Sequence, residues 1–179
     1  LGVLIPVAEE AAKVTKNSRV GVIGTRATVN SKVYDKELAK ISSEIKVFSN
    51  ACPLLVPLIE ENYHNKPEAV SILKKYLKPL KSCNIDTLIL GCTHYPLMMK
   101  NIKRIMGKRV TVLPSGEITA ESLKKYLARH PEIETKLSKN KTRTFLTTDD
   151  PAKFKEFTEK HFGMKIKMPS QIANSQAKE

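Results

Sequence analysis

The chain has 179 residues, of which 41% are hydrophobic, and a formal net charge of +13. Its length suits one domain of ordinary size or two small lobes with a packed core. The sequence shows no secretory apolar region and no apolar run near the roughly 20 residues that cross a bilayer, so we expect no membrane partner. Three cysteines without a Cys-x-x-Cys pair argue against disulfides or a zinc site and favour the cytoplasm.

The excess of 31 Lys and Arg over 18 Asp and Glu raises the question of a nucleic acid partner. Basic residues cluster at 100–109 and 136–143, but no aromatic residues interleave with them for base stacking. We therefore favour a solvated basic face that attracts acidic metabolites over a nucleic acid interface.

Short apolar runs alternate with amphipathic segments in the first part of the chain, which is typical of stacked βαβ units. We predict an α/β fold with a doubly wound parallel sheet. In chain order, the pattern predicts strand-like residues at 1–5, a helix at 6–16, a strand at 19–23, a helix at 31–41, a strand at 46–48, helices at 53–63 and 67–82, a strand at 85–90, a helix at 95–106 and a strand at 109–113.

The part of the chain after residue 113 is too small to form a second complete doubly wound sheet. It predicts a helix at 118–129, a strand at 142–147, a helix at 151–162, an alternating apolar stretch at 164–168 and a loose polar tail at 170–179. Their apolar faces need cover from elsewhere. Because the chain also begins within an apparent strand and without methionine, we expect it to be the C-terminal part of a longer protein.

The stretch 85–96 carries the strongest functional signal. A buried strand stops at Gly91 and is followed by Cys92, Thr93 and His94, and Pro96 suits the first turn of a helix. Ligands of parallel sheets collect beyond the carboxyl ends of the strands. Free backbone N–H groups there would favour a carboxylate and lower the pKa of a thiol, while His94 could relay its proton.

The three cysteines do not carry equal weight. A free cysteine usually behaves as a small buried hydrophobe, and we assign that structural role to Cys52 and Cys83. Cys92 differs because its position, the preceding glycine and the neighbouring threonine and histidine all favour a chemical role.

Three segments carry a family resemblance: VGVIGTRATV at 20–29, ACPLLVPLIE at 51–60 and LGCTHYP at 90–96. In sequence and order they resemble glutamate racemases, and the likeness fades only in the tail. The resemblance implies two α/β domains facing each other across a cleft. Residues 1–113 would be the second domain, and 114–179 the C-terminal portion of the first, whose N-terminal part is missing.

The family's chemistry needs no cofactor and no metal. Two cysteines work on opposite faces of the α-carbon, each alternating between thiolate base and thiol acid. Cys92 matches the cysteine that deprotonates L-glutamate. The other cysteine has no counterpart in this sequence, so we expect this chain to be inactive alone and to need the missing N-terminal segment as a partner.

The resemblance also assigns supporting roles. His94 would assist Cys92 as acid or base and contact the substrate, and Glu60 would be linked to His94. Thr93, Thr25 and Thr28 would bind glutamate. Without the resemblance, Glu60 is an ordinary surface glutamate, and Thr25 and Thr28 are ordinary loop residues.

Alternatives stay open at this level. An aspartate racemase of the same superfamily typically has glutamate after Cys-Thr, so His94 favours glutamate as the substrate. A catalytically silent basic binding protein is the alternative from another class. Pro114-Ser115 departs from the family's Asp-Ser pair and leaves the local geometry open. A role in supplying D-glutamate for peptidoglycan synthesis is implied by the resemblance alone. Whether the protein forms a homodimer is left open.

Overall fold

The computed structural model describes residues 2–173. By packing, the chain divides into two compact units, Leu1–Glu134 and Thr135–Glu179. None of the described helices is both long and apolar enough to cross a bilayer.

The first unit is built on a four-stranded parallel sheet with strand order β2-β1-β3-β4. The strands are β1 (Arg19–Gly24), β2 (Lys46–Ala51), β3 (Thr87–Gly91) and β4 (Thr111–Leu113). The strand order changes direction between β1 and β3, and in open α/β sheets ligands bind at such a switch point. The expected doubly wound α/β fold is therefore confirmed.

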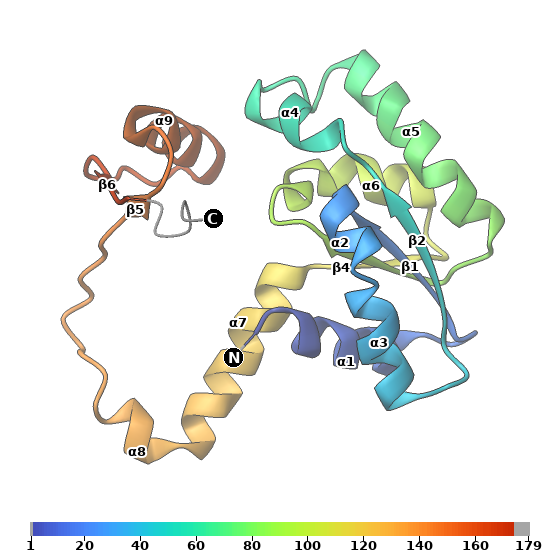
Figure 1. Ribbon diagram of the computed structural model, residues 1–179, viewed down its shortest axis with the longest axis horizontal. Helices are drawn as coiled ribbons and strands as arrows, with labels where there is room; N and C mark the ends of the chain where they lie inside the picture. The colour runs from blue at the N-terminus through green and yellow to red at the C-terminus, as the bar shows by residue number, and fades with distance from the viewer. Residues whose placement is uncertain (1, 174–179) are drawn as a thin grey trace. The chain divides into compact units, whose positions relative to one another are not determined.

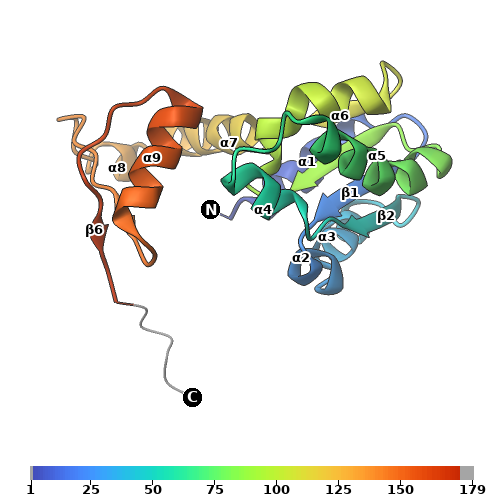
Figure 2. The ribbon, with the colours of Figure 1, turned by 90° about the horizontal axis from the view of Figure 1, so that it is seen from above.

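Helices cover both faces of this sheet (Figures 1 and 2). On one face α1 (Leu4–Val14) packs against α3 (Val33–Ile41), and on the other α5 (Pro67–Ser82) packs against α6 (Met99–Met106). Shorter elements connect them: α2 (Arg26–Asn30), α4 (Leu55–Glu60) and the 3₁₀ helix η1 (Tyr95–Met98). The unit ends with α7 (Ser115–Arg129) and α8 (Pro131–Glu134).

The core follows from strands that are apolar on both faces. Val20, Val22 and Ile89 are buried against Val7 and other residues of α1 and α3. A second set is buried without exposed surface and includes Leu73 and Leu77 of α5, Ile102 of α6 and Leu88 of β3. Burial on both sides explains why these strands read as continuous apolar runs rather than alternating ones.

Most predicted elements of this unit are present, but α8 was not predicted, the helix expected at 95–106 is divided into η1 and α6, and several other bounds differ. Residues 4 and 5 begin α1 rather than a strand, because Pro6 is tolerated in a first helical turn. Helix α2 was not predicted, β2 runs on to Ala51, and the helix expected at 53–63 is the shorter α4.

Helix α7 extends the first unit beyond the sheet by packing against α1. None of its residues is fully buried, and the Leu123 side chain is 45% exposed. The division of the domains after residue 113 stays a prediction.

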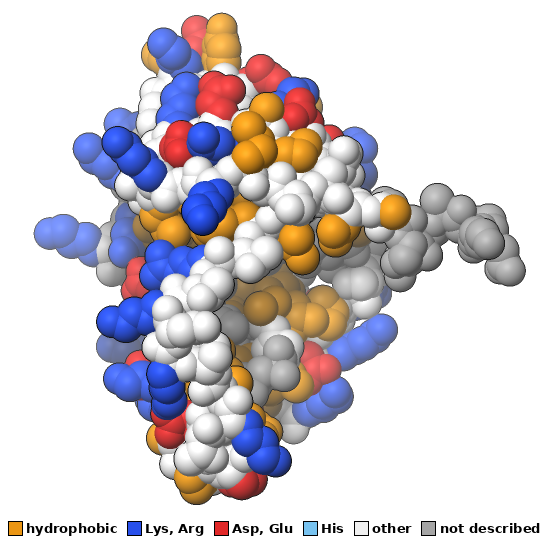
Figure 3. Space-filling view, turned by 90° about the vertical axis from the view of Figure 1, so that its left-hand side faces the viewer, with side chains coloured by type: hydrophobic (Ala, Val, Ile, Leu, Met, Phe, Trp, Pro, Cys, Tyr) orange, Lys and Arg blue, Asp and Glu red, His pale blue; other side chains and the backbone are white. Residues whose placement is uncertain are grey.

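The second unit contains α9 (Pro151–Phe162) and two short parallel strands, β5 (Leu146–Thr147) and β6 (Ser170–Gln171). The strand expected at 142–147 is thus only two residues long. The apolar stretch at 164–168 forms no strand, and pairing occurs two residues later in what was expected to be tail. Residues 174–179 of that tail lie outside the described residues. Apolar side chains such as Phe162 and Met168 are exposed in this unit, and Figure 3 shows apolar and basic side chains interspersed on the face it draws.

Asp86 ties together the amino ends of the strands. Its carboxylate accepts hydrogen bonds from the Thr15 hydroxyl (2.7 Å), the backbone N–H groups of Lys16 (2.6 Å) and Asn17 (2.8 Å), and the Thr87 hydroxyl (2.9 Å). Burial by itself raises the pKa of this carboxyl, but the four hydrogen bonds outweigh it and hold the pKa below its ordinary value.

We predict that Asp86→Asn lowers the free energy of unfolding by about 2 kcal/mol, since hydrogen bonds to a charged group are the stronger kind. Because the folded pKa is depressed, this stabilisation is present above the unfolded pKa of about 3.9 and is lost as the pH falls through the folded value. Urea unfolding followed by circular dichroism at neutral and acidic pH measures both effects. Glu44→Gln, which changes an exposed carboxylate, is the control, and equal losses in the two variants would contradict the prediction.

Candidate active site

Two glycines face each other where β1 and β3 end. Gly24 pairs in register with Gly91. A Cβ on Gly91 would lie 3.0 Å from the Ile23 carbonyl oxygen and 3.2 Å from the Thr28 methyl carbon, and one on Gly24 would lie 3.0 Å from the same methyl. A side chain at either position would therefore crowd Thr28, and glycine at both lets the loop after β1 lie close to the end of β3.

Thr28 and Thr25 hold that loop together. The Thr25 hydroxyl oxygen accepts a hydrogen bond from the Thr28 N–H (3.2 Å), which caps the start of α2, and the two hydroxyl oxygens lie 3.1 Å apart. The Thr28 hydroxyl also donates to the Gly91 carbonyl over 3.4 Å. The structure thus places both predicted threonines at the switch point, beside the segment that carries Cys92.

Cys92, His94 and Glu60 form a chain of polar contacts. The Cys92 Sγ lies 3.9 Å from the His94 Nδ1, and the His94 Nε2 lies 3.3 Å from the Glu60 Oε1. The Glu60 side chain is 56% exposed and that of His94 27% exposed. A histidine with its proton on Nε2 would donate to Glu60 and leave Nδ1 to take the thiol proton. The 32 residues between Glu60 and Cys92 are bridged by the fold.

The pKa of Cys92 is raised, not lowered as expected from the sequence. Burial is the largest cause, and the negative charge of Glu60 adds to it. The backbone N–H groups of His94 and Tyr95 do act as expected and lower the pKa, but they do not offset burial. The surroundings of this thiol in the chain therefore favour its protonated form.

Thr93 lies at the open side of this group. It is exposed, and its hydroxyl oxygen is 3.5 Å from the His94 Nδ1. Its hydroxyl is accessible to a bound ligand and can also contact the same ring nitrogen that faces the thiol.

Two supporting contacts were missed by sequence reasoning. Cys52 donates its N–H to the Gly24 carbonyl (2.8 Å) and accepts a hydrogen bond from the hydroxyl of the buried Tyr95 (3.1 Å). Its backbone thus ties the end of β1 to the segment that follows Cys92, while burial raises the pKa of its own thiol to about 12. The structural role assigned to Cys52 fits this position, but no sequence pattern indicated the partners.

The segment Pro114-Ser115 lies near the same strand ends. Ser115 donates its hydroxyl to the carbonyl of Leu90 (3.2 Å), one residue before Gly91. Pro114 stands at the N-cap of α7 and gives no side-chain cap.

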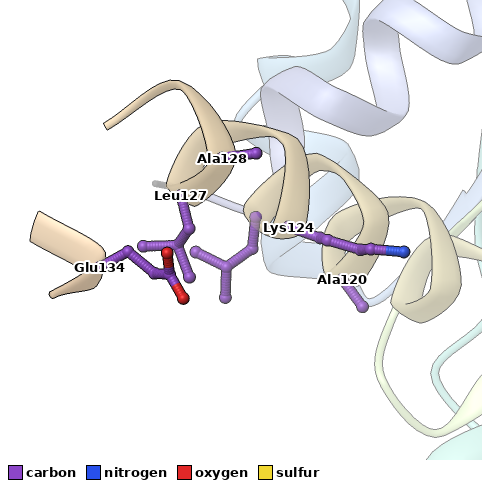
Figure 4. Close-up of a pocket in the computed structure, with 6 residues that line it drawn as sticks. Ala120, Lys124, Leu127, Ala128 and Glu134 are labelled. Atoms are coloured by element: carbon purple, nitrogen blue, oxygen red, sulfur yellow. The ribbon is translucent and has the colours of Figure 1, made fainter. Parts of the chain in front are cut away.

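An open pocket lies away from these residues. Residues of α7 (Ala120, Leu123, Lys124, Leu127 and Ala128) line it together with Glu134 of α8 (Figure 4). It contains none of the predicted site residues, and its walls are mostly apolar apart from Lys124 and Glu134.

Sequence comparison finds close relatives over most of the chain. The chain is 39% identical over 166 residues to the glutamate racemase of Streptococcus suis (strain 05ZYH33). This alignment covers 93% of this chain and 62% of the relative. The chain is 41% identical over 170 residues to the glutamate racemase of Oceanobacillus iheyensis, covering 92% of this chain and 62% of the relative. The chain therefore spans less than two thirds of the length of these relatives.

Solved structures agree with this. Glutamate racemase isoform RacE1 from Bacillus anthracis matches with a TM-score of 0.85 and 36% identity, over all of this chain and 65% of that one. The glutamate racemase from Francisella tularensis, solved in complex with D-glutamate, matches with a TM-score of 0.83 and 29% identity, over 96% of this chain and 62% of that one. The sequence family Asp/Glu/Hydantoin racemase matches residues 1–123. The chain belongs to this racemase family.

Proposed function

We propose that the protein containing this chain interconverts L- and D-glutamate, and that Cys92 is one of its two catalytic thiols. The observation that carries the proposal is the contact chain from Cys92 through His94 to Glu60 at the switch point of a parallel sheet. The glutamate racemases to which the chain is similar support the choice of substrate.

Inversion of an α-carbon requires one group to remove a proton from one face and another to deliver a proton to the opposite face. Cys92 serves one face, with His94 and Glu60 receiving and returning its proton. The other two cysteines cannot serve the opposite face, because Cys52 is fully buried and Cys83 caps the far end of α5. The second thiol comes from a segment outside these 179 residues.

The threonines hold the substrate. Hydroxyl groups of Thr25, Thr28 and Thr93 can donate to carboxylate oxygens or accept from an ammonium group. Bound glutamate between the loops after β1 and β3 would present its α-hydrogen to Cys92. We propose that the reaction needs neither pyridoxal phosphate nor a metal, and that it supplies D-glutamate for peptidoglycan in the cytoplasm.

A first prediction concerns the link between Glu60 and the thiol. Glu60→Gln removes a negative charge that raises the pKa of Cys92, so the pH profile of Cys92 alkylation should shift to lower pH. Mass-mapped labelling with iodoacetamide across a pH series measures this, and added glutamate should protect Cys92. Glu61→Gln, the exposed neighbour, should leave the profile unchanged. A profile that does not move in Glu60→Gln would show that the charge does not act on this thiol.

A second prediction concerns catalysis by the protein expressed from its full coding sequence. Cys92→Ala should lower kcat for racemisation by about 10²-fold or more, as expected for removal of a positioned acid–base group. Circular dichroism with each pure enantiomer follows the rate. Cys83→Ala should retain activity, and a chelator should change nothing. Full activity in Cys92→Ala, or inactivation by chelator that zinc reverses, would refute the proposed mechanism.

A third prediction concerns the 179 residues alone. They should not racemise glutamate, because no second thiol can reach the opposite face of the α-carbon. They should also bind a hydrophobic dye or self-associate, since apolar side chains such as Leu123 and Phe162 are exposed. Incubation in heavy water with each enantiomer, with optical rotation and α-deuteration as readouts, tests the first point. Steady racemisation that Cys92→Ala abolishes would show that another group acts as the second base.

A further inference from the structure

Helices α5 and α6 together present a strongly basic surface, here called the basic face. They lie side by side on one face of the sheet (Figures 1 and 2). The exposed cations on these helices and on the turn after α6 are Lys74, Lys75, Lys78, Lys81, Lys100, Lys103, Arg104, Lys108 and Arg109.

The packing of the two helices explains why these cations share one surface. Leu73, Leu77 and Leu80 of α5 are buried, so the intervening lysines face outward. Ile102 and Met106 of α6 are also buried, so the basic residues between them face outward. The Lys81 Nζ donates a hydrogen bond to the Ile105 carbonyl (3.1 Å), which places the end of the α5 row directly beside α6.

The basic face has almost no acidic counterpart. Helices α5 and α6 and the turn after α6 carry nine Lys and Arg against one acid, the exposed Glu68 in the first turn of α5. The ion pairs found among residues 2–173 involve none of the nine cations. On the opposite face of the sheet, by contrast, α1 and α3 carry four acids and three lysines, and two of those lysines are paired with glutamates.

The side chains of the basic face favour one kind of polyanion over a lipid bilayer or a single-stranded nucleic acid. No large apolar or aromatic side chain is exposed within the described stretch 64–122, so this surface offers no anchor for a lipid bilayer. It also offers no platform for stacking the bases of a single strand. The missing aromatic residues, which argued against nucleic acid in the sequence, do not matter for a duplex, whose affinity comes mainly from its phosphates.

From this we infer that the basic face binds the phosphate backbone of duplex nucleic acid, without reading its sequence. Lys74 and Lys81 are about 10 Å apart along the α5 axis at 1.5 Å per residue, a length over which duplex DNA carries about six phosphate charges. The second row of cations on α6 runs beside the first. None of the nine residues belongs to the proposed catalytic or substrate-binding groups, so this binding is separate from racemisation.

The test is a binding titration with the protein expressed from its full coding sequence. Fluorescence anisotropy with a labelled 25-base-pair DNA of arbitrary sequence should show binding that weakens steeply between 50 and 200 mM salt. Substituting Lys74, Lys78 and Lys103 by Gln should weaken binding at least about tenfold. It should also reduce the slope of log K against log salt by about 2.7, because each neutralised phosphate contributes about 0.9 to that slope.

The matched control substitutes Lys13, Lys36 and Lys40 by Gln, which removes the same charge from α1 and α3 and should reduce the slope much less. Racemisation and the thermal melting curve should be unchanged in both triple variants. An equal effect of the two triple variants would overturn the inference, as would no binding at 50 mM salt. Tighter binding to a single strand, or to vesicles of anionic lipid, than to the duplex would also overturn it.

Discussion

The site depends on the parallel register of β1 and β3, which sets Gly24 opposite Gly91. A Cβ at either position would crowd Thr28, so the two adjacent glycines let the loop after β1 lie against the end of β3. The polar groups of the two loops meet for this reason. A shift in register would separate Thr25 and Thr28 from Cys92 and remove the common site without changing any of the residues in it.

The electrostatics of Cys92 fit the acid–base role proposed for it, because opposing effects act on the pKa of its thiol. Burial and Glu60 favour the protonated thiol, whereas two backbone N–H groups favour the thiolate. A group that must act as base in one direction and as acid in the other cannot be strongly committed to either form. In the proposed mechanism, Glu60 receives the proton through His94 and does not touch the sulfur. Its negative charge is therefore only a smaller cause of the raised pKa of the Cys92 thiol.

Much of the fold could be predicted from the sequence because its strands are apolar and its helices have clear ends. The helix at 67–82 and that at 151–162 were predicted with their observed bounds, and Pro67 and Pro151 mark their first turns. The failures occur where long-range pairing decides the structure. The last strand lies at Ser170–Gln171, in polar residues that pair through their backbone with β5 and give no apolar signal. Within the candidate site, the three motif segments pointed to Cys92, His94 and the threonines. The hydrogen bonds of the Cys52 backbone with Gly24 and Tyr95 join residues far apart in the sequence, so they could be seen only in the fold. The sign of the thiol pKa shift was wrong because the degree of burial cannot be read from a motif.

Screening of charges by salt affects the proposed substrate site and the basic face differently. At physiological salt, exposed charges act over about 8 Å, so each surface lysine influences only groups close to it. In the proposed site, a small dicarboxylate between the loops after β1 and β3 would touch few cations at once, and its binding would rest on the short-range donors of Thr25, Thr28 and Thr93. A polyanion lying along α5 and α6 contacts many cations together, and the release of its counterions adds with each contact. The same net charge of +13 would therefore contribute little to holding the proposed small substrate but can contribute strongly to binding an extended phosphate backbone.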